Sequence, residues 1–164
     1  MNESLRQAQG KKVLFFGIYD PNYSRNAVLM LGFRENGWEV DECRIDPKQV
    51  GGLRKYLQLW KEGKKLKGDK FNLIIVAFPG HTVVWLARLL FGKKIIFDMF
   101  VSLYNSEVED RGNGNRMWNY LLDWYSVRLA NKVLLDTNEQ IKYVSNLVHV
   151  TPSKFIRVFV GSTI

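Results

Sequence analysis

Residues 71–100 read FNLIIVAFPGHTVVWLARLLFGKKIIFDMF. This stretch opens with a short apolar run, FNLIIVAF (71–78), that a Pro-Gly pair ends. A helical segment from about Thr82 to Leu90 follows, and a second run, KKIIFDMF (93–100), comes after it. A short apolar run bounded by turn residues is typical of a parallel strand buried on both faces. The stretch therefore predicts a strand, a helix and a second strand in succession.

The same alternation continues on both sides of this unit. Further strands are predicted at VLFFGIY (13–19), WEVDECRI (38–45), 132–135 and FIRVFV (155–160). One further helix is predicted to begin at a capping Ser24 and to end at Asn36-Gly37. Three more are predicted over 53–66, 116–130 and 138–147, and Asp136, Thr137 and Asn138 are predicted to cap the last of them. Alternating strands and helices of this length predict an α/β fold, a Rossmann-like doubly wound, mostly parallel sheet with helices on both faces.

The domain prediction follows from length and composition. The chain has 164 residues, of which 46% are hydrophobic, which suits one domain with a real core and excludes a disordered chain. We expect residues 1–10 to be a polar, flexible N-terminus and residues 11–164 to form the single domain. No apolar run approaches the roughly 20 residues of a membrane span, and the polar start shows no secretory signal.

Cysteine usage and charge bound the chemistry. The single cysteine, Cys43, excludes an internal disulfide and a cysteine metal cluster, and we interpret it as a structural thiol. No metal-ligand spacing is present, so no metal is expected. Together these features predict a cytoplasmic protein. The net charge of +8 is compatible with anionic lipid, nucleic acid or phosphorylated substrates as partners.

In a doubly wound sheet, ligands bind at the carboxyl ends of the strands, near the switch in strand order. This rule selects four segments of the chain: 17–26, 78–82, 98–105 and 136–139.

Around these segments the sequence resembles the family-4 glycosyltransferases, which have the GT-B architecture of two facing Rossmann-like domains. The motifs that carry the resemblance are GIYDPNYSRN (17–26), VAFPGH (76–81), IIFDMFVSLYNS (95–106), ANKVLLDTNEQIKYV (130–144) and KFIRVFVGST (154–163). Their order and spacing cover nearly the whole chain from Lys11. The resemblance implies the N-terminal, acceptor-side domain of such an enzyme.

The resemblance also implies what the chain lacks. The family's donor-binding half, with its paired acidic motif, is missing because the sequence stops at Ile164. We therefore expect no cofactor in this chain, a nucleotide-sugar donor held by a C-terminal domain of the same or a separate chain, and an isolated chain that is inactive. The expected acceptor is lipid-linked or a polysaccharide. Two alternatives stay open: a non-catalytic membrane-recruiting subunit that docks a separate catalytic half, and an unrelated flavodoxin-like or nucleotide-binding domain.

The loop after the first strand supplies the first candidate substrate-binding residues, which are Gly17, Tyr19, Asn22, Arg25 and Asn26. Backbone N–H groups at a helix start attract anions, and Arg25 would add a bidentate donor for phosphate or carboxylate. The dinucleotide fingerprint GxGxxG is absent from this loop. The alternative interpretation is a turn with a capping serine and a solvated arginine.

Asp98 and His81 are the candidate catalytic residues. Asp98 interrupts an apolar run, and the resemblance places a general base or a substrate-positioning group at this strand end. The alternative is an aspartate bonded to backbone amides of the next loop. His81 would position an acceptor hydroxyl, or would only cap the following helix. Ser102, Tyr104 and Asn105 are further candidates for sugar or phosphate binding.

Two segments have a predicted role at the surface. The loop from Asn105 to Arg116 is polar and glycine-containing, so we expect it to be mobile, either as a substrate lid or as a plain solvated loop. Eight lysines and arginines lie from Lys48 to Lys70, and four of them, Lys61, Lys64, Lys65 and Lys67, are predicted to face an anionic membrane. The alternative is an ordinary surface helix with a solvated basic face. No nucleic-acid-binding signature accompanies the charge, so we do not expect a nucleic-acid partner.

Overall fold

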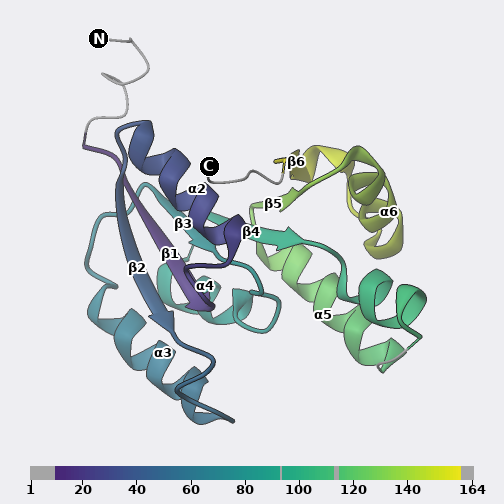
Figure 1. The fold of residues 1–164 in the computed structure, drawn as a ribbon, viewed down its shortest axis with the longest axis horizontal. Coiled ribbons are helices and arrows are strands. Elements are labelled where there is room, and N and C mark those ends of the chain that lie inside the picture. The colour runs from purple at the N-terminus through teal and green to yellow at the C-terminus, as the bar shows by residue number, and fades with distance from the viewer. Residues whose placement is uncertain (1–9, 93, 113–114, 160–164) are drawn as a thin grey trace.

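The computed structural model describes residues 10–92, 94–112 and 115–159 (Figure 1). Of the N-terminus predicted to be flexible (1–10), residues 1–9 lie outside the described residues, and Gly10 is part of a turn. The strands are β1 (Lys12–Ile18), β2 (Glu39–Ile45), β3 (Leu73–Val76), β4 (Ile95–Phe100), β5 (Lys132–Leu135) and β6 (Phe155–Arg157). The helices are α2 (Ser24–Glu35), α3 (Arg54–Lys65), α4 (Val84–Phe91), η1 (Tyr104–Asp110), α5 (Arg116–Leu129), α6 (Asn138–Val148) and η2 (Pro152–Lys154).

The six strands form one sheet in the order β2-β1-β3-β4-β5-β6, and each neighbouring pair is parallel. The predicted Rossmann-like α/β fold is confirmed. The strand order is the flavodoxin-like variant of the doubly wound sheet, in which the chain leaves β1 to one side and returns to β3 on the other. The carboxyl ends of β1 and β3 therefore form the topological switch point, where a crevice opens.

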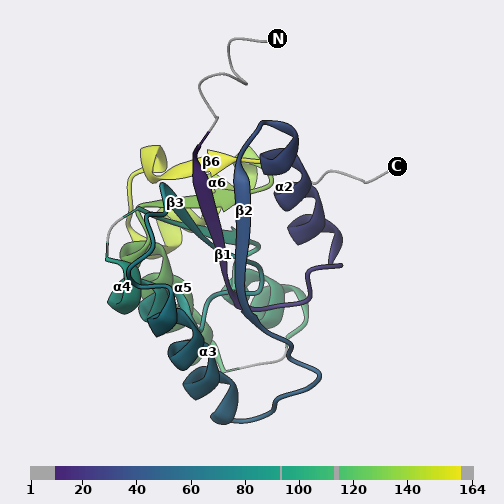
Figure 2. The ribbon, with the colours of Figure 1, turned by 90° about the vertical axis from the view of Figure 1, so that its left-hand side faces the viewer.

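The two faces of the sheet are covered unequally. Alternate residues of the strands, such as Leu14 and Phe16 of β1, pack with α3, α4, α5 and α6 in the larger core cluster. The residues between them, such as Phe15, pack with α2 in a smaller cluster. Figure 2 shows α2 on one side of the sheet and α3, α4 and α5 together on the other. β2 lies at one edge of the sheet, and its Cys43 is buried with a free thiol.

Within the larger layer, α4 packs between α3 and α5. A glycine allows the close contact of α3 with its neighbours. A Cβ atom added to Gly63 would lie 2.6 Å from Leu90 Cδ1 and 3.2 Å from Phe16 Cε2. The missing side chain therefore brings α3 down onto α4 and the sheet.

Three local predictions need correction. Ser24 does not cap α2: it is the first helical residue, Tyr23 holds the cap position, and no side chain makes a cap bond there. The predicted loop 105–116 contains the π-helix η1, whose backbone begins with amides bonded to Ser102 and Asp123. The last strand ends at Arg157, earlier than predicted. Of the three residues predicted to cap α6, Thr137 is the cap, since its Oγ1 accepts a hydrogen bond from the Gln140 amide, and Asn138 is the first residue of the helix.

Candidate functional site

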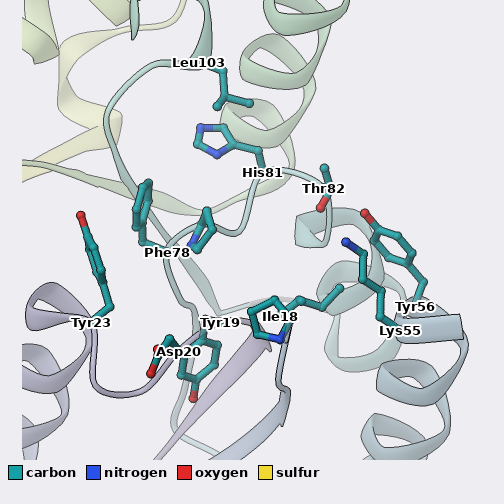
Figure 3. Close-up of a pocket in the computed structure, with 12 residues that line it drawn as sticks. Ile18, Tyr19, Asp20, Tyr23, Lys55, Tyr56, Phe78, His81, Thr82 and Leu103 are labelled. Carbon is teal, nitrogen blue, oxygen red and sulfur yellow. The ribbon is translucent and has the colours of Figure 1, made fainter. Parts of the chain in front are cut away.

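A cavity of about 480 Å³ opens at the carboxyl ends of β1 and β3, at the topological switch point (Figure 3). It lies where the loop after β1, the loop after β3 and the start of α3 meet. Its lining residues are Ile18, Tyr19, Asp20, Tyr23, Pro47, Lys55, Tyr56, Phe78, Pro79, His81, Thr82 and Leu103. The volume falls in the range of about 300–1,000 Å³ that is usual for small-ligand sites.

One side of the cavity is aromatic. The rings of Tyr23 and Phe78 lie 5.5 Å apart at 35°, and the ring of Phe100 meets Phe78 edge-on at 5.2 Å. The Tyr23 side chain is 43% exposed, so its ring can contact a ligand without a rearrangement of the core. In Figure 3 the rings of Tyr23 and Phe78 lie across the cavity from Lys55 and Tyr56.

The polar groups of the cavity carry both signs of charge. Asp20 Oδ1 accepts the Asn22 amide at 2.9 Å, and Asp20 Oδ2 lies 3.5 Å from Lys48 Nζ. The backbone hydrogen bond from Asn22 and the charge of Lys48 lower the pKa of Asp20, so this carboxylate is ionised at neutral pH. Lys55 and Thr82 add an ammonium group and a hydroxyl group to the lining. The cavity thus offers a hydrogen-bond acceptor, a cation and a hydroxyl beside its aromatic wall.

Arg25 and Asp98, the two charged candidates from the sequence, bind each other instead of lining the cavity. Arg25 Nε lies 3.0 Å from both carboxylate oxygens of Asp98, and Arg25 Nη2 lies 2.8 Å from Oδ1. Arg25 Nη1 donates to the Val158 carbonyl at 2.9 Å. The side chains of Arg25 and Asp98 are 2% and 0% exposed. Burial raises the pKa of Asp98, and the hydrogen bonds and charge of Arg25 act against that rise.

Asn26 joins the two loops that border the switch point. It is fully buried, and its Nδ2 donates to the Asp20 carbonyl at 3.1 Å and to the Phe78 carbonyl at 2.8 Å. Its Oδ1 has no hydrogen-bond partner among the described residues. Asn26 therefore fixes the separation of the loops that carry Asp20 and Phe78, and with it the shape of the cavity.

His81 is buried at the inner end of the cavity, and its pKa is lowered to about 3, because burial disfavours the charged ring. Its Nε2 lies 3.4 Å from Asp123 Oδ1 without hydrogen-bond geometry. The His81 carbonyl accepts the Tyr125 hydroxyl at 2.6 Å. His81 is thus a neutral, enclosed imidazole at neutral pH.

Asp123 organises the start of η1, and the sequence analysis missed it. Its carboxylate accepts the Ser102 hydroxyl at 2.7 Å and the amides of Leu103 and Tyr104 at 3.1 and 3.0 Å. Burial raises its pKa, and these hydrogen bonds lower it. A signal was available: Asp123 interrupts the apolar residues of a helix at a position that faces the core. The hydroxyl of Ser102 is therefore bonded to Asp123 within the protein.

The other predicted substrate-binding residues fall into three groups. Gly17 and Tyr19 are buried at the end of β1, where the Tyr19 hydroxyl donates to Glu42 at 3.0 Å and only Tyr19 lines the cavity. Asn22 is exposed beside the cavity. Tyr104 and Asn105 belong to η1 and bond to its surroundings: the Tyr104 hydroxyl accepts from Arg116, and Asn105 Oδ1 accepts from Gln140 at 3.1 Å. Neither lines the cavity.

The structure also adds cavity residues that were not among the candidates from the sequence, and five of them are Asp20, Tyr23, Lys55, Phe78 and Thr82. Four of these five lie within or beside the strand-end segments 17–26 and 78–82 that the switch-point rule selected. Lys55 is one of the eight lysines and arginines from Lys48 to Lys70, which we call the basic stretch. Only its position at the start of α3 could have distinguished it from the other lysines as a cavity residue.

The four lysines predicted to face a membrane are exposed on and beside α3. Lys64 Nζ lies 3.9 Å from the centre of the Trp60 ring, and Lys65 pairs with Glu62 at 2.7 Å. In the part of the chain that the structure describes, no helix is both long and apolar enough to cross a bilayer. Within the same residues, no group of three or more histidine, cysteine, aspartate or glutamate side chains could hold a metal ion.

A comparison with protein-family models finds no match for this chain, and a comparison with curated proteins finds none either.

Proposed function

We propose that this chain is the acceptor-side half of a glycosyltransferase, and that the cavity at the switch point binds a glycan or lipid-linked acceptor. A donor-binding domain, in the same or a separate chain, holds the nucleotide sugar and completes the active site. The single observation that carries the proposal is the place and lining of the cavity, which combines an aromatic wall with a carboxylate, an ammonium group and a hydroxyl. The resemblance of the strand-end motifs to family-4 glycosyltransferases supports the same function.

The cavity lining suits a sugar. The apolar C–H face of a pyranose ring packs against an aromatic face, a contact that Tyr23 and Phe78 can provide. Sugar hydroxyls both donate and accept hydrogen bonds. Asp20 can accept from them, Lys55 can donate to them or to an acceptor phosphate, and Thr82 can do either.

The same geometry gives little support to a nucleotide at this position. Of the groups in the loop after β1, Arg25 was the expected phosphate donor, and its guanidinium is directed to Asp98 and the Val158 carbonyl. The loop also lacks GxGxxG. We therefore assign donor binding to the partner domain.

In this proposal Arg25 and Asp98 hold the elements around the cavity without lining it, and His81 is a neutral, buried part of the cavity wall. All three are buried, and the ion pair holds the start of α2 against β4. Asp20 is the ionised carboxylate that can orient an acceptor hydroxyl. A cytoplasmic protein bound peripherally to the inner face of a membrane, with its basic α3 near the lipid, is part of the same proposal.

The test compares two variants in glycan binding. Tyr23→Ala removes an aromatic face of the cavity. Leu31→Ala removes a side chain of nearly equal exposure (42%) from α2, the helix that Tyr23 precedes, and Leu31 does not line the cavity. Oligosaccharides and lipid-linked acceptor analogues are titrated into each variant by calorimetry. We expect Tyr23→Ala to weaken acceptor binding by about 1–3 kcal/mol and Leu31→Ala to leave it unchanged. Equal binding by both variants would contradict an acceptor site in this cavity.

A further inference from the structure

The outer surface of α3, α4 and α5 carries most of the exposed large apolar side chains. Twelve such side chains occur in the described residues, and eight of them lie on or directly before these three helices. We call these eight residues the apolar face: Leu53, Leu57, Trp85, Leu89, Met117, Trp118, Leu121 and Trp124. Met117 is 67% exposed and Trp118 is 59% exposed, although side chains of this size are usually turned inward. A continuous apolar surface of this kind marks an interaction site.

The apolar face is continuous across the three helices. In α5, Met117, Leu121 and Trp124 recur at helical spacing, as do Trp85 and Leu89 in α4. In α3, Leu53 and Leu57 extend along one side of the helix into Lys61 and Lys64. Because α4 packs between α3 and α5, and all three lie on the same side of the sheet in Figure 2, these stripes form one surface.

The exposed charges on this surface are mostly positive, and Glu62, the acidic residue of α3, pairs with Lys65 at 2.7 Å. The cations of α4 and α5 are Arg88, Arg116 and Arg128, and the single acidic residue of the two helices, Asp123, is buried. Arg128 lies over the Trp124 ring, 4.2 Å from its centre. Tryptophan together with arginine and lysine is the combination that anchors proteins at a membrane–water interface with anionic lipids.

The apolar face borders the mouth of the cavity. Leu53 and Leu57 flank Lys55 and Tyr56, which line the cavity. Trp85 Nε1 donates to the carbonyl of Thr82, another lining residue, at 2.8 Å. A surface that contacts this face therefore lies beside the cavity opening.

We propose that the apolar face seats the protein on the surface of an anionic bilayer, with its tryptophans at the level of the headgroups. The lipid surface is favoured over a second copy of the chain by the charges. A two-fold contact through α4 and α5 would bring the arginines of both copies together with no exposed acidic partner on either helix. Seated in this way, the cavity opens next to the headgroups, where a lipid-linked acceptor presents its sugar. Binding of the apolar face to the bilayer, which we call the membrane seat, does not depend on glycosyl transfer. Only its role in acceptor delivery rests on the proposed function.

The test uses sedimentation of the chain with phosphatidylcholine vesicles, with and without phosphatidylglycerol, in the absence of donor and acceptor. The test variant is Trp85→Ser/Trp118→Ser. The control is Leu31→Ser, which removes a side chain of similar exposure from α2, on the opposite side of the sheet. We expect the wild-type chain and the control to bind anionic vesicles, and the double variant to bind at least about tenfold more weakly. Three of the five tryptophans belong to the apolar face, so a blue shift of fluorescence should accompany binding.

Three outcomes would overturn the membrane seat. The first is a wild-type chain that ignores both kinds of vesicle, and the second is a folded double variant that binds as well as the wild type. The third is self-association of the wild-type chain that the double variant loses while neither binds lipid, which would assign the face to a second copy. Because no sugar is present, each of these outcomes leaves the acceptor-binding test of the cavity unaffected.

Discussion

The guanidinium of Arg25, in the first turn of α2, and the carboxylate of Asp98, in β4, form a buried ion pair between residues that are 73 positions apart in the chain. The pair lies on the face of the sheet that α2 covers. Because Arg25 directly follows the loop after β1, the pair fixes that loop beside the cavity. A further hydrogen bond from Arg25, to the Val158 carbonyl, adds the segment after β6. One side chain thus holds together three segments that border the carboxyl edge of the sheet.

Removal of Arg25 should destabilise the fold strongly. Arg25→Met would leave the Asp98 carboxylate buried without its partner, and the loss of one member of a buried pair costs about 3–5 kcal/mol. The free energy of unfolding, measured in urea, should fall by that amount. The double variant Arg25→Met/Asp98→Leu should recover most of the loss, because neither charge then remains buried. A single variant as stable as the wild type would contradict the pairing.

Asp98→Asn separates the positional role of Asp98 from the catalytic one that the sequence suggested. As part of the ion pair, Asp98 contributes to stability, so the variant should unfold more easily in the isolated chain. If Asp98 were a general base, the variant would lower turnover of the proposed complete glycosyltransferase by at least about 100-fold in a stably folded protein. Urea unfolding of the chain and turnover of the complete enzyme, measured on the same variant, distinguish the two roles.

Stability should fall in acid because of His81. Its pKa is lowered from 6.5 to about 3 in the folded protein, so between these values the unfolded chain binds a proton that the folded chain does not. The free energy of unfolding should therefore decrease as the pH falls from about 6.5 towards 4, by up to about 1.4 kcal/mol per pH unit from this group. Asp98 and Asp123, whose pKa values are raised, act in the opposite direction near pH 4. The measurement is the pH dependence of urea unfolding, which His81→Gln should flatten between pH 5 and 6.5. An identical slope in the variant would show that His81 is not the group responsible.

Gly80 should not accept a side chain. A Cβ atom there would lie 2.6 Å from the Ala77 carbonyl oxygen and 2.5 Å from Val76 Cγ1. Gly80→Ala should therefore displace the backbone beside His81 and destabilise the fold by about 1–3 kcal/mol. Gly68→Ala is the matched control, since nothing lies within 4 Å of the added atom. Thermal unfolding of both variants checks this, and equal melting temperatures would contradict the close approach.

The four lysines of the basic stretch should contribute the salt-dependent part of membrane binding. Replacement of Lys61, Lys64, Lys65 and Lys67 by glutamine removes roughly 4 kcal/mol of attraction at most, and less where Lys65 already pairs with Glu62. Binding of the variant to anionic vesicles should weaken and respond less to added salt, because contacts of exposed charges are screened over about 8 Å. The fold should be preserved, since exposed charges add little stability. Unchanged salt dependence would exclude these lysines from the contact.

The alternation of strands and helices was predictable because it is local. The runs that form β1, β3 and β4 are apolar and bounded by turn residues, and in a parallel sheet such runs are strands. The strand order was not predictable in the same way, since it depends on which strands pair across the sheet. Without that order, the rule of strand ends selected four segments but could not say which of them border the cavity.

The candidate residues show a second limit. Asp98 and Arg25 were selected as separate ligand-binding or catalytic candidates, yet they bind each other. Because they are 73 residues apart, no local sequence pattern indicates that they pair. The π-helix η1 escaped prediction for a related reason. Its polar sequence is typical of a loop, and its backbone is held by Asp123, which lies later in the chain.

The central claim is that this chain binds the acceptor and not the donor. The direct measurement is calorimetry of the wild-type chain with two sets of ligands, acceptor glycans or their lipid-linked analogues on one side and nucleotide sugars on the other. We predict binding of an acceptor that Tyr23→Ala weakens, and no binding of a nucleotide sugar at concentrations up to the millimolar range. Micromolar binding of a nucleotide sugar to the isolated chain, with no response to any acceptor, would contradict the account.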